Sequence, residues 1–239
     1  MSSCKIRGVV FDMDGVVVDS HPGHRRAWKK FLQSVGRDAT DTELDVILDG
    51  HKREEILHRF FGDLSPETIT EYGARKDQML RELDEQLQPI AGVVDFLDSL
   101  RQAKARIGLA TSASHKRTHA TISELGLTHY FDAIVTGDEV ACGKPDPSIY
   151  RVAAARLGEA PPDLVAIEDA PAGVKAATAA GIRCVGLAFG TKAEILRSAG
   201  ADPVVSHFQQ LSISTLQEHF SAGSHNRGAN NHPEYSRTA

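Results

Sequence analysis

Short apolar segments alternate with helical segments along most of this chain, and this order restricts the possible folds more than any other feature of the sequence. Residues 93–103 and 148–157 show the helical periodicity, in which apolar side chains recur every three or four positions. The apolar segments have the length and composition of buried strands, and they lie at residues 6–11, 107–110, 133–136, 164–167, 184–187 and 203–205. Strands that alternate with helices predict a parallel sheet covered by helices on both faces.

One long stretch breaks the alternation. Residues 20–88 have helical periodicity with little strand signal, and Pro89 and Gly92 mark the return to the alternating pattern. We therefore expect a Rossmann-like, doubly wound α/β core made of residues 1–19 and 89–220, with a small all-α cap domain inserted into it. The chain crosses between the two parts twice, so we expect two hinge segments that let the cap open and close.

Composition and charge argue against several classes of function. The net charge of −5 and the pI of about 6.1 disfavour a nucleic-acid binder, which usually carries clustered basic residues. Cys4, Cys142 and Cys184 are far apart, which suits a reducing compartment, by default the cytoplasm, better than disulfides or a zinc site. The apolar runs are too short to span a bilayer, so we expect no membrane and no nucleic-acid partner, with a monomer favoured. The polar residues 221–239 are expected to be disordered.

Polar residues follow four of the predicted strands, at the edge of the sheet where folds of this kind bind ligands. The first strand ends in Asp12-Met13-Asp14-Gly15, where two carboxylates lie two positions apart and the glycine permits a tight bend. Two close carboxylates repel each other unless a cation lies between them, so the pair favours a Mg²⁺ site. Taken alone, the same residues also fit a surface turn.

The second and third groups suit an anion. The segment Thr111-Ser112-Ala113-Ser114 follows a strand and offers hydroxyl and backbone N–H groups at the start of a helix, where the helix dipole favours negative charge. A plain helix N-cap is the alternative. Lys144 lies between Gly143 and a stiff Pro-Asp-Pro turn that could hold its ammonium group near a dianion, or it is simply a surface lysine.

The fourth group is the acidic pair Glu168-Asp169, which follows the apolar strand 164–167. Two acids at the end of a buried strand are costly without a metal ion or a lysine nearby. Together the four groups supply a nucleophile, metal ligands, an anion-binding hydroxyl and a lysine that can neutralise a phosphate. Phosphoryl transfer needs mainly positioning and charge neutralisation, so this is the chemistry that the four groups predict.

These motifs, in this order, resemble the signature of the haloacid dehalogenase (HAD) superfamily over residues 6 to about 218. The resemblance implies an enzyme in which Asp12 is the nucleophile that forms an aspartyl-phosphate and Asp14 is the general acid and base. It also implies Mg²⁺ as the cofactor, bound by four groups: Asp12, the Asp14 carbonyl, Glu168 and Asp169. In the phosphate-binding segment the implied roles belong to Ser112, or to Thr111 if the alignment shifts by one residue, with Ala113 beside them and Lys144 neutralising the charge.

Asp14 is the residue that separates the subclasses of this superfamily. True haloacid dehalogenases lack an acid at its position, so the resemblance points to phosphate substrates, and P-type ATPases would need membrane helices. The chemistry further requires that Asp14 be protonated while Asp12 is ionised. Different environments can separate the pKa values of two acids in this way.

The helical segment resembles the cap of the β-phosphoglucomutase-like and phosphoglycolate-phosphatase-like subfamily. The sequence is most similar to that of β-phosphoglucomutase in four places: Asp19-Ser20, His24 with Arg26-Ala27-Trp28, Gly50 with Arg53-Glu54, and Ala74-Arg75-Lys76. The resemblance implies that His24, Arg53 and Lys76 orient the acid/base and bind a sugar phosphate, and the two cations suit a second phosphate. Alternatively, Arg53 and Lys76 are solvated charges, and His24 is a partly buried residue beside Trp28.

Three functions are compatible with these residues. The first is a Mg²⁺-dependent phosphatase acting on a small phosphorylated metabolite, with a sugar phosphate favoured. The second is a β-phosphoglucomutase-type mutase, in which a sugar hydroxyl accepts the phosphoryl group before water does. The third is a non-catalytic binding protein with a HAD fold, against which all four motif positions carry competent side chains.

Overall fold

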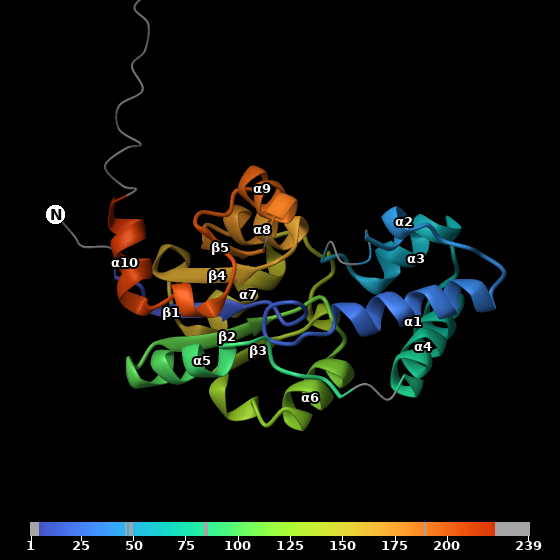
Figure 1. The fold of residues 1–239 in the computed structure, drawn as a ribbon, viewed down its shortest axis with the longest axis horizontal. Coiled ribbons are helices and arrows are strands. Elements are labelled where there is room, and N and C mark those ends of the chain that lie inside the picture. Colours follow the sequence, from blue (N-terminus) through green and yellow to red (C-terminus); the bar gives the residue numbers. More distant parts are fainter. Residues whose placement is uncertain (1–4, 46, 48–49, 84–85, 189, 223–239) are drawn as a thin grey trace, which may run out of the picture.

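The computed structural model describes residues 5–45, 47, 50–83, 86–188 and 190–222 of the chain (Figure 1). Its centre is a sheet of parallel strands in the order β3-β2-β1-β4-β5-β6. The strand bounds are Gly8–Phe11 (β1), Arg106–Ala110 (β2), Ala133–Val135 (β3), Leu164–Glu168 (β4), Arg183–Leu187 (β5) and Val204–Val205 (β6). Every predicted strand is present with small differences at its ends, and the Rossmann-like α/β fold is confirmed.

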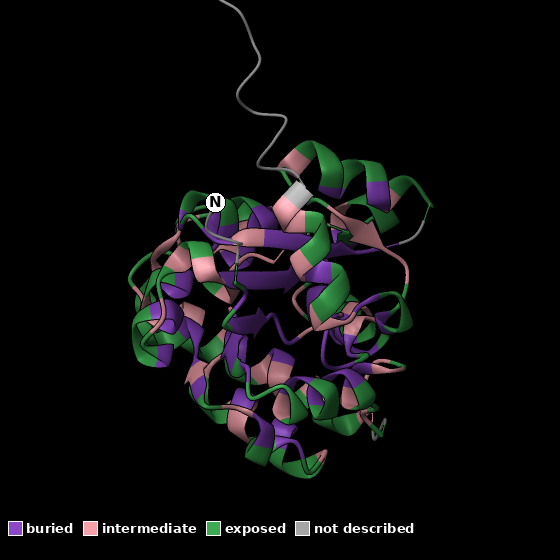
Figure 2. Cartoon of the chain, turned by 90° about the vertical axis from the view of Figure 1, so that its left-hand side faces the viewer, coloured by how far each residue is buried: buried purple, intermediate pink, exposed green. Residues whose placement is uncertain are grey.

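Helices cover both faces of the sheet. They are α5 (Val93–Gln102), α6 (His115–Glu124), α7 (Ser148–Leu157), α8 (Pro171–Ala179), α9 (Gly190–Ala199) and α10 (Ile213–Ala222). Side chains alternate along β1, so that Val9 and Phe11 pack with α5, α6 and α10, while Val10 packs with α7, α8 and α9. Figure 2 shows the buried strands enclosed by helices with exposed outer surfaces. Helix α10 includes residues 221 and 222, which were expected to be disordered, and residues 223–239 lie outside the described residues.

The helices described between residues 21 and 82 form a separate layer, which we call the helical insert. They are α1 (His21–Ser34), α2 (Asp41–Asp45), α3 (Arg53–Phe61) and α4 (Pro66–Glu82). The insert has an apolar cluster of its own, in which Trp28 packs against Phe31 and Phe60, so Trp28 is a core residue of the insert. Figure 1 shows these helices gathered beside one end of the sheet.

The two segments that connect the core to the insert lie side by side. Val18 forms an antiparallel bridge with Pro89, and the Asp19 N–H donates a hydrogen bond to the Gln88 carbonyl at 2.9 Å. The Ile90 N–H donates to the Val17 carbonyl at 3.0 Å. Backbone pairing at this point fixes where the insert begins and ends relative to the sheet.

The structure also addresses two expectations drawn from composition. Among the described residues, no helix is both long enough and apolar enough to cross a membrane. Cys142 is exposed and Cys184 is buried, and both are free thiols. Cys4 lies outside the described residues.

Candidate active site

Strand pairing brings the first and fourth motifs together. Phe11 of β1 pairs with Ile167 of β4, and the Asp12 N–H donates to the Ile167 carbonyl at 3.0 Å, so Asp12 and Glu168 leave neighbouring strands at the same level. Asp169 completes a buried cluster in which one carboxylate oxygen of each residue lies within 4.8 Å of the others. Helix α8 begins directly beyond this cluster at Pro171, a residue type that suits the first position of a helix.

The carboxylate cluster has the chemistry of a divalent cation site. Glu168 Oε2 and Asp169 Oδ1 are buried and have no hydrogen-bond partner in the part of the chain that the structure describes. Buried carboxylate oxygens of this kind fit Mg²⁺, which prefers oxygen ligands. Gly173 on α8 makes room for the cluster, since a Cβ atom there would lie 1.9 Å from Glu168 Oε1. The helix can therefore approach the acids closely only with glycine at this position.

Lys144 is buried between the acids. Its ammonium group donates hydrogen bonds to Asp12 Oδ1 at 2.5 Å, Glu168 Oε1 at 2.6 Å and the Ala110 carbonyl at 3.0 Å. Burial alone would lower the pKa of Lys144, but the two carboxylates raise it above its usual value, so the side chain stays charged. The surface-lysine alternative is therefore wrong. The Tyr150 hydroxyl also donates to Glu168 Oε1, at 2.6 Å, and further fixes that carboxylate.

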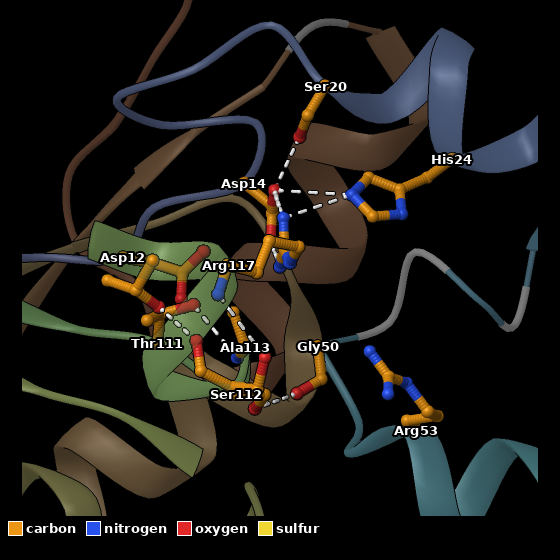
Figure 3. A network of polar contacts seen from close by, with 12 residues as sticks. Asp12, Asp14, Ser20, His24, Gly50, Arg53, Thr111, Ser112, Ala113 and Arg117 are labelled. Atoms are coloured by element: carbon orange, nitrogen blue, oxygen red, sulfur yellow. Dashed lines mark hydrogen bonds and ion pairs between the residues drawn. The ribbon is translucent and has the colours of Figure 1, made fainter. Parts of the chain in front are cut away.

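Asp14 is held by different partners. Ser20 donates to Asp14 Oδ1 at 2.5 Å, and the Arg117 guanidinium donates to both carboxylate oxygens (Figure 3). Burial alone would raise the pKa of Asp14, but the charge and hydrogen bonds of Arg117 hold it well below its usual value. Burial raises the pKa of Asp12 well above its usual value, against the opposing charge of Lys144.

In this arrangement Arg117 favours an ionised Asp14, and the protonation states expected from the sequence stay a prediction for the site with its cation and substrate. The expectation required a protonated Asp14 beside an ionised Asp12, and it took no account of Arg117, which the sequence analysis did not single out. Arg117 lies on α6 just after Ser114, and a basic residue one turn into the helix after the hydroxyl-rich segment is the signal that could have indicated it. His21 and Lys192 were also missed, and they lie 3.5 Å and 2.8 Å from Asp169 Oδ2.

The hydroxyl-rich segment lies between the sheet and the helical insert. Ser114 is the N-cap of α6, and its side chain accepts a hydrogen bond from the Arg117 N–H at 3.4 Å, so the N-cap role belongs to Ser114. The Thr111 hydroxyl accepts from the Ala113 N–H at 3.1 Å. Ser112 donates to the Gly50 carbonyl of the insert at 2.7 Å, which places its hydroxyl at the boundary between the two layers (Figure 3).

The predicted insert residues face the same region. Lys76 and His24 are buried, and Lys76 Nζ lies 2.8 Å from His24 Nδ1, so the solvated alternative is wrong for Lys76. Arg53 is partly exposed and donates to Asp77 at 2.6 Å. All three residues line a cavity of about 750 Å³ that Asp12, Asp14 and Ser112 also line. A volume of this size suits a small metabolite.

We expect the buried Lys76 to make stability depend on pH. Burial lowers the pKa of Lys76 to about 7, from 10.5, so between these values the unfolded chain binds a proton that the folded chain does not. The contribution of Lys76 to the free energy of unfolding therefore rises with pH above 7. Methionine does not titrate, so the free energy of unfolding of Lys76→Met lacks this dependence on pH. The free energy of unfolding of the wild type should therefore rise relative to that of Lys76→Met by about 2–3 kcal/mol between pH 7 and pH 9.5.

Denaturant unfolding at the two pH values measures this difference. Lys30→Met on the exposed side of α1 is the matched control and should show no such change. A pH-independent difference between Lys76→Met and the wild type would mean that Lys76 stays charged in the folded chain.

An α/β core of this topology, with these four motifs at the carboxyl ends of its strands and a helical insert facing them, is the architecture of HAD-like hydrolases. The chain belongs to the haloacid dehalogenase-like hydrolase family, whose family model matches residues 6–181. It is therefore an enzyme, and the non-catalytic alternative is set aside.

Named relatives include both a phosphatase and a mutase. The chain is 30% identical over 211 residues to the phosphorylated carbohydrates phosphatase of Thermotoga maritima, covering 87% of this chain and 98% of the relative. It is 33% identical over 222 residues to the β-phosphoglucomutase of Bacillus subtilis, covering 89% and 95%. The crystal structure of β-phosphoglucomutase from Clostridium difficile superposes with a TM-score of 0.81 at 27% identity, covering 92% of this chain and 100% of that one.

Proposed function

We propose that this enzyme is a Mg²⁺-dependent phosphatase that hydrolyses a small sugar phosphate through an aspartyl-phosphate on Asp12. The observation that carries the proposal is the Lys144 ammonium group, which lies within 2.6 Å of both Asp12 and Glu168. The proposal is supported by the grouping of Asp12 with a fixed positive charge and two further carboxylates, beside a cavity of about 750 Å³ that Asp12 and Asp169 line. The phosphatase relative that acts on phosphorylated carbohydrates supports the substrate class.

In the proposed first step, an Asp12 oxygen attacks the phosphorus atom and the bond from phosphorus to the sugar oxygen breaks. Asp14 gives a proton to the leaving oxygen. Lys144 and the Ser112 hydroxyl bind the transferring phosphoryl group and reduce the repulsion between it and Asp12. In the second step a water molecule attacks the phosphorus atom, the bond from phosphorus to the Asp12 oxygen breaks, and inorganic phosphate leaves while Asp14 takes the proton of that water.

The residues present fit Mg²⁺. Four groups would bind it: Asp12, the Asp14 carbonyl, Glu168 and Asp169. When bound, the ion supplies positive charge that favours the ionised form of the nucleophile and attracts the phosphoryl oxygens. Lys144 holds Asp12 and Glu168 in position for both roles.

The helical insert is proposed to act as a movable cap over the site, with residues 20–88 as the cap domain. The insert contacts the core through Ser112 and the Gly50 carbonyl, and through Lys52, which donates to the Val140 carbonyl at 2.6 Å. Two further polar contacts join the layers, His24 with Arg117 at 3.1 Å and His21 with Asp169 at 3.5 Å. Such contacts can break and re-form as substrate enters and product leaves.

One observation favours the mutase as the second candidate. His24 and Lys76 of the insert are buried, and His24 Nε2 lies 3.7 Å from Asp14 Oδ1. A closed site that excludes water lets a sugar hydroxyl compete for the phosphoryl group. The relative from Bacillus subtilis is a β-phosphoglucomutase. The residues bound to the phosphoryl group are the same for both reactions.

Product analysis separates the two candidates. We would incubate the enzyme and Mg²⁺ with a panel of aldose, ketose and hexitol phosphates, and with β-glucose 1-phosphate plus a bisphosphate primer, and measure inorganic phosphate and isomerised ester. A phosphatase releases one phosphate for each ester consumed. Glucose 6-phosphate formed with little free phosphate would overturn the phosphatase proposal in favour of the mutase.

A further inference from the structure

Arg53, Lys76 and Asp77 form part of the cavity lining that the helical insert contributes, and we call these three residues the insert wall. Arg53 is the first residue of α3, and Asp77 lies on α4. Arg53 Nη2 donates a hydrogen bond to Asp77 Oδ2 at 2.6 Å, and the two side chains are 32% and 22% exposed. Figure 3 shows the Arg53 side chain extending from the insert. The ion pair is therefore partly open to a ligand in the cavity.

The surface of α4 is shaped to receive Arg53. Gly73 lies one turn before Asp77 on the same side of the helix, and a Cβ atom at Gly73 would lie 2.7 Å from both Cδ and Nη1 of Arg53. The arginine side chain can therefore lie against α4 only with glycine at this position. Among the described residues, the Arg53 guanidinium makes no other side-chain hydrogen bond, so its remaining N–H groups are available to a ligand.

Asp77 balances the positive charge of the insert wall. Its Oδ1 is buried and lies 3.5 Å from Lys76 Nζ, while its Oδ2 accepts from Arg53. Burial lowers the pKa of Lys76 to about 7, so above this pH the lysine is mostly neutral, and the charges of Arg53 and Asp77 cancel each other. A second phosphate that approached Arg53 would also approach the Asp77 carboxylate, which repels it.

A hydroxyl group matches this ion pair better than a phosphate does. A hydroxyl both donates and accepts hydrogen bonds, whereas a guanidinium only donates and an ionised carboxylate only accepts. We propose that Arg53 and Asp77 bind hydroxyl groups of the sugar, so that the substrate is a monophosphate whose other end is uncharged. The inference rests on the proposed phosphatase activity and narrows its substrate class. It differs from the binding of a second phosphate, which the family resemblance suggested for Arg53 and Lys76.

Two esters of mannitol provide the test. The two ends of mannitol are equivalent, so mannitol 1-phosphate and mannitol 1,6-bisphosphate differ only in the second phosphate, whichever end reacts. At pH 8 with Mg²⁺, initial rates of phosphate release should give the wild type a higher kcat/KM for the monophosphate. In Asp77→Asn the ratio of kcat/KM for the bisphosphate to that for the monophosphate should rise about tenfold, because the repelling charge is gone.

Arg53→Met is the second variant and tests the hydroxyl contact itself. It removes the donor, so kcat/KM for mannitol 1-phosphate should fall about tenfold relative to kcat/KM for p-nitrophenyl phosphate, which carries no sugar hydroxyl groups. An equal loss on these two esters would mean that Arg53 has a structural role and does not bind the sugar.

Two further variants are controls for Asp77→Asn. Asp77→Glu keeps the carboxylate and should retain the preference for the monophosphate. Asp45 of the insert also accepts a hydrogen bond from an arginine, Arg25, but it is not among the described residues that line the cavity. Asp45→Asn should therefore keep the ratio of the wild type. Asparagine has the shape of aspartate, and the Tm of each variant checks that it folds.

A ratio that does not change in Asp77→Asn would overturn the proposal, as would a wild type that prefers the bisphosphate. The second result would mean that Arg53 leaves Asp77 to bind a second phosphate. Calorimetric titration of both mannitol esters into Asp12→Asn, with and without Asp77→Asn, measures the same preference without turnover. If binding changes as expected but the wild type releases no phosphate, the proposed function is wrong and the preference of the insert wall stands. If neither ester binds, the inference itself is wrong.

Discussion

Asp12→Asn leaves the chain folded and removes phosphate release. The amide oxygen of asparagine is a poor nucleophile, so the aspartyl-phosphate cannot form, and we expect kcat to fall on the order of 10⁴-fold. Asparagine has the shape of aspartate and keeps an oxygen that can accept the hydrogen bond from Lys144, which now measures 2.5 Å. Inorganic phosphate measured with the best substrate of the panel gives the rate directly.

The same substitution should not destabilise the fold. Burial raises the pKa of Asp12 well above its usual value, and the negative charges of Glu168 and Asp169 in the same buried cluster raise it further. A neutral side chain at this position therefore relieves repulsion. We expect a Tm equal to or above that of the wild type in Mg²⁺-free buffer, together with a smaller increase on addition of Mg²⁺. Asp63→Asn, at an exposed position of the insert, is the matched control. Substantial phosphate release by Asp12→Asn would place the nucleophile elsewhere.

The sequence was sufficient to predict the sheet because each strand is a compact apolar run ended by polar residues. It also indicated the edge at which Asp12, Lys144 and Glu168 lie, because carboxyl ends of parallel strands share one edge. The contact between Asp12 and Glu168 depends in addition on β1 and β4 being neighbours. That strand order results from packing of the whole core, and the spacing of residues along the chain does not contain it.

The contacts of Asp14 show where sequence reasoning ended. Arg117 is separated from Asp14 by 103 positions, and no local pattern connects a helical arginine to a strand-end aspartate. The ion pair between Arg117 and Asp14 was not predicted for this reason. For Lys76 the sequence left two alternatives. The resemblance to the family suggested a site residue, whereas the charge of the side chain suggested an exposed one. The packing of α1 against α4 buries it.

Lys144→Met should have the largest effect on stability of any single change in the site. Lys144 is the positive charge between Asp12 and Glu168, and methionine fills similar volume without replacing that charge. Removing one partner from a buried ion pair costs about 3–5 kcal/mol, because the remaining charge is uncompensated. Activity should also fall by about 10²–10³-fold, since the ammonium group no longer neutralises the phosphoryl oxygens.

Divalent cation distinguishes this explanation from simple loss of packing. In Lys144→Met, Mg²⁺ should raise the Tm by more than it does in the wild type, because the ion then replaces the positive charge that Lys144 supplies to Asp12 and Glu168. Lys175→Met, at an exposed position of α8, is the matched control and should respond to Mg²⁺ as the wild type does. If Lys144→Met is as stable as the wild type without Mg²⁺, the two carboxyl groups take up protons in its place. In that event Lys144 would not be what keeps the nucleophile ionised.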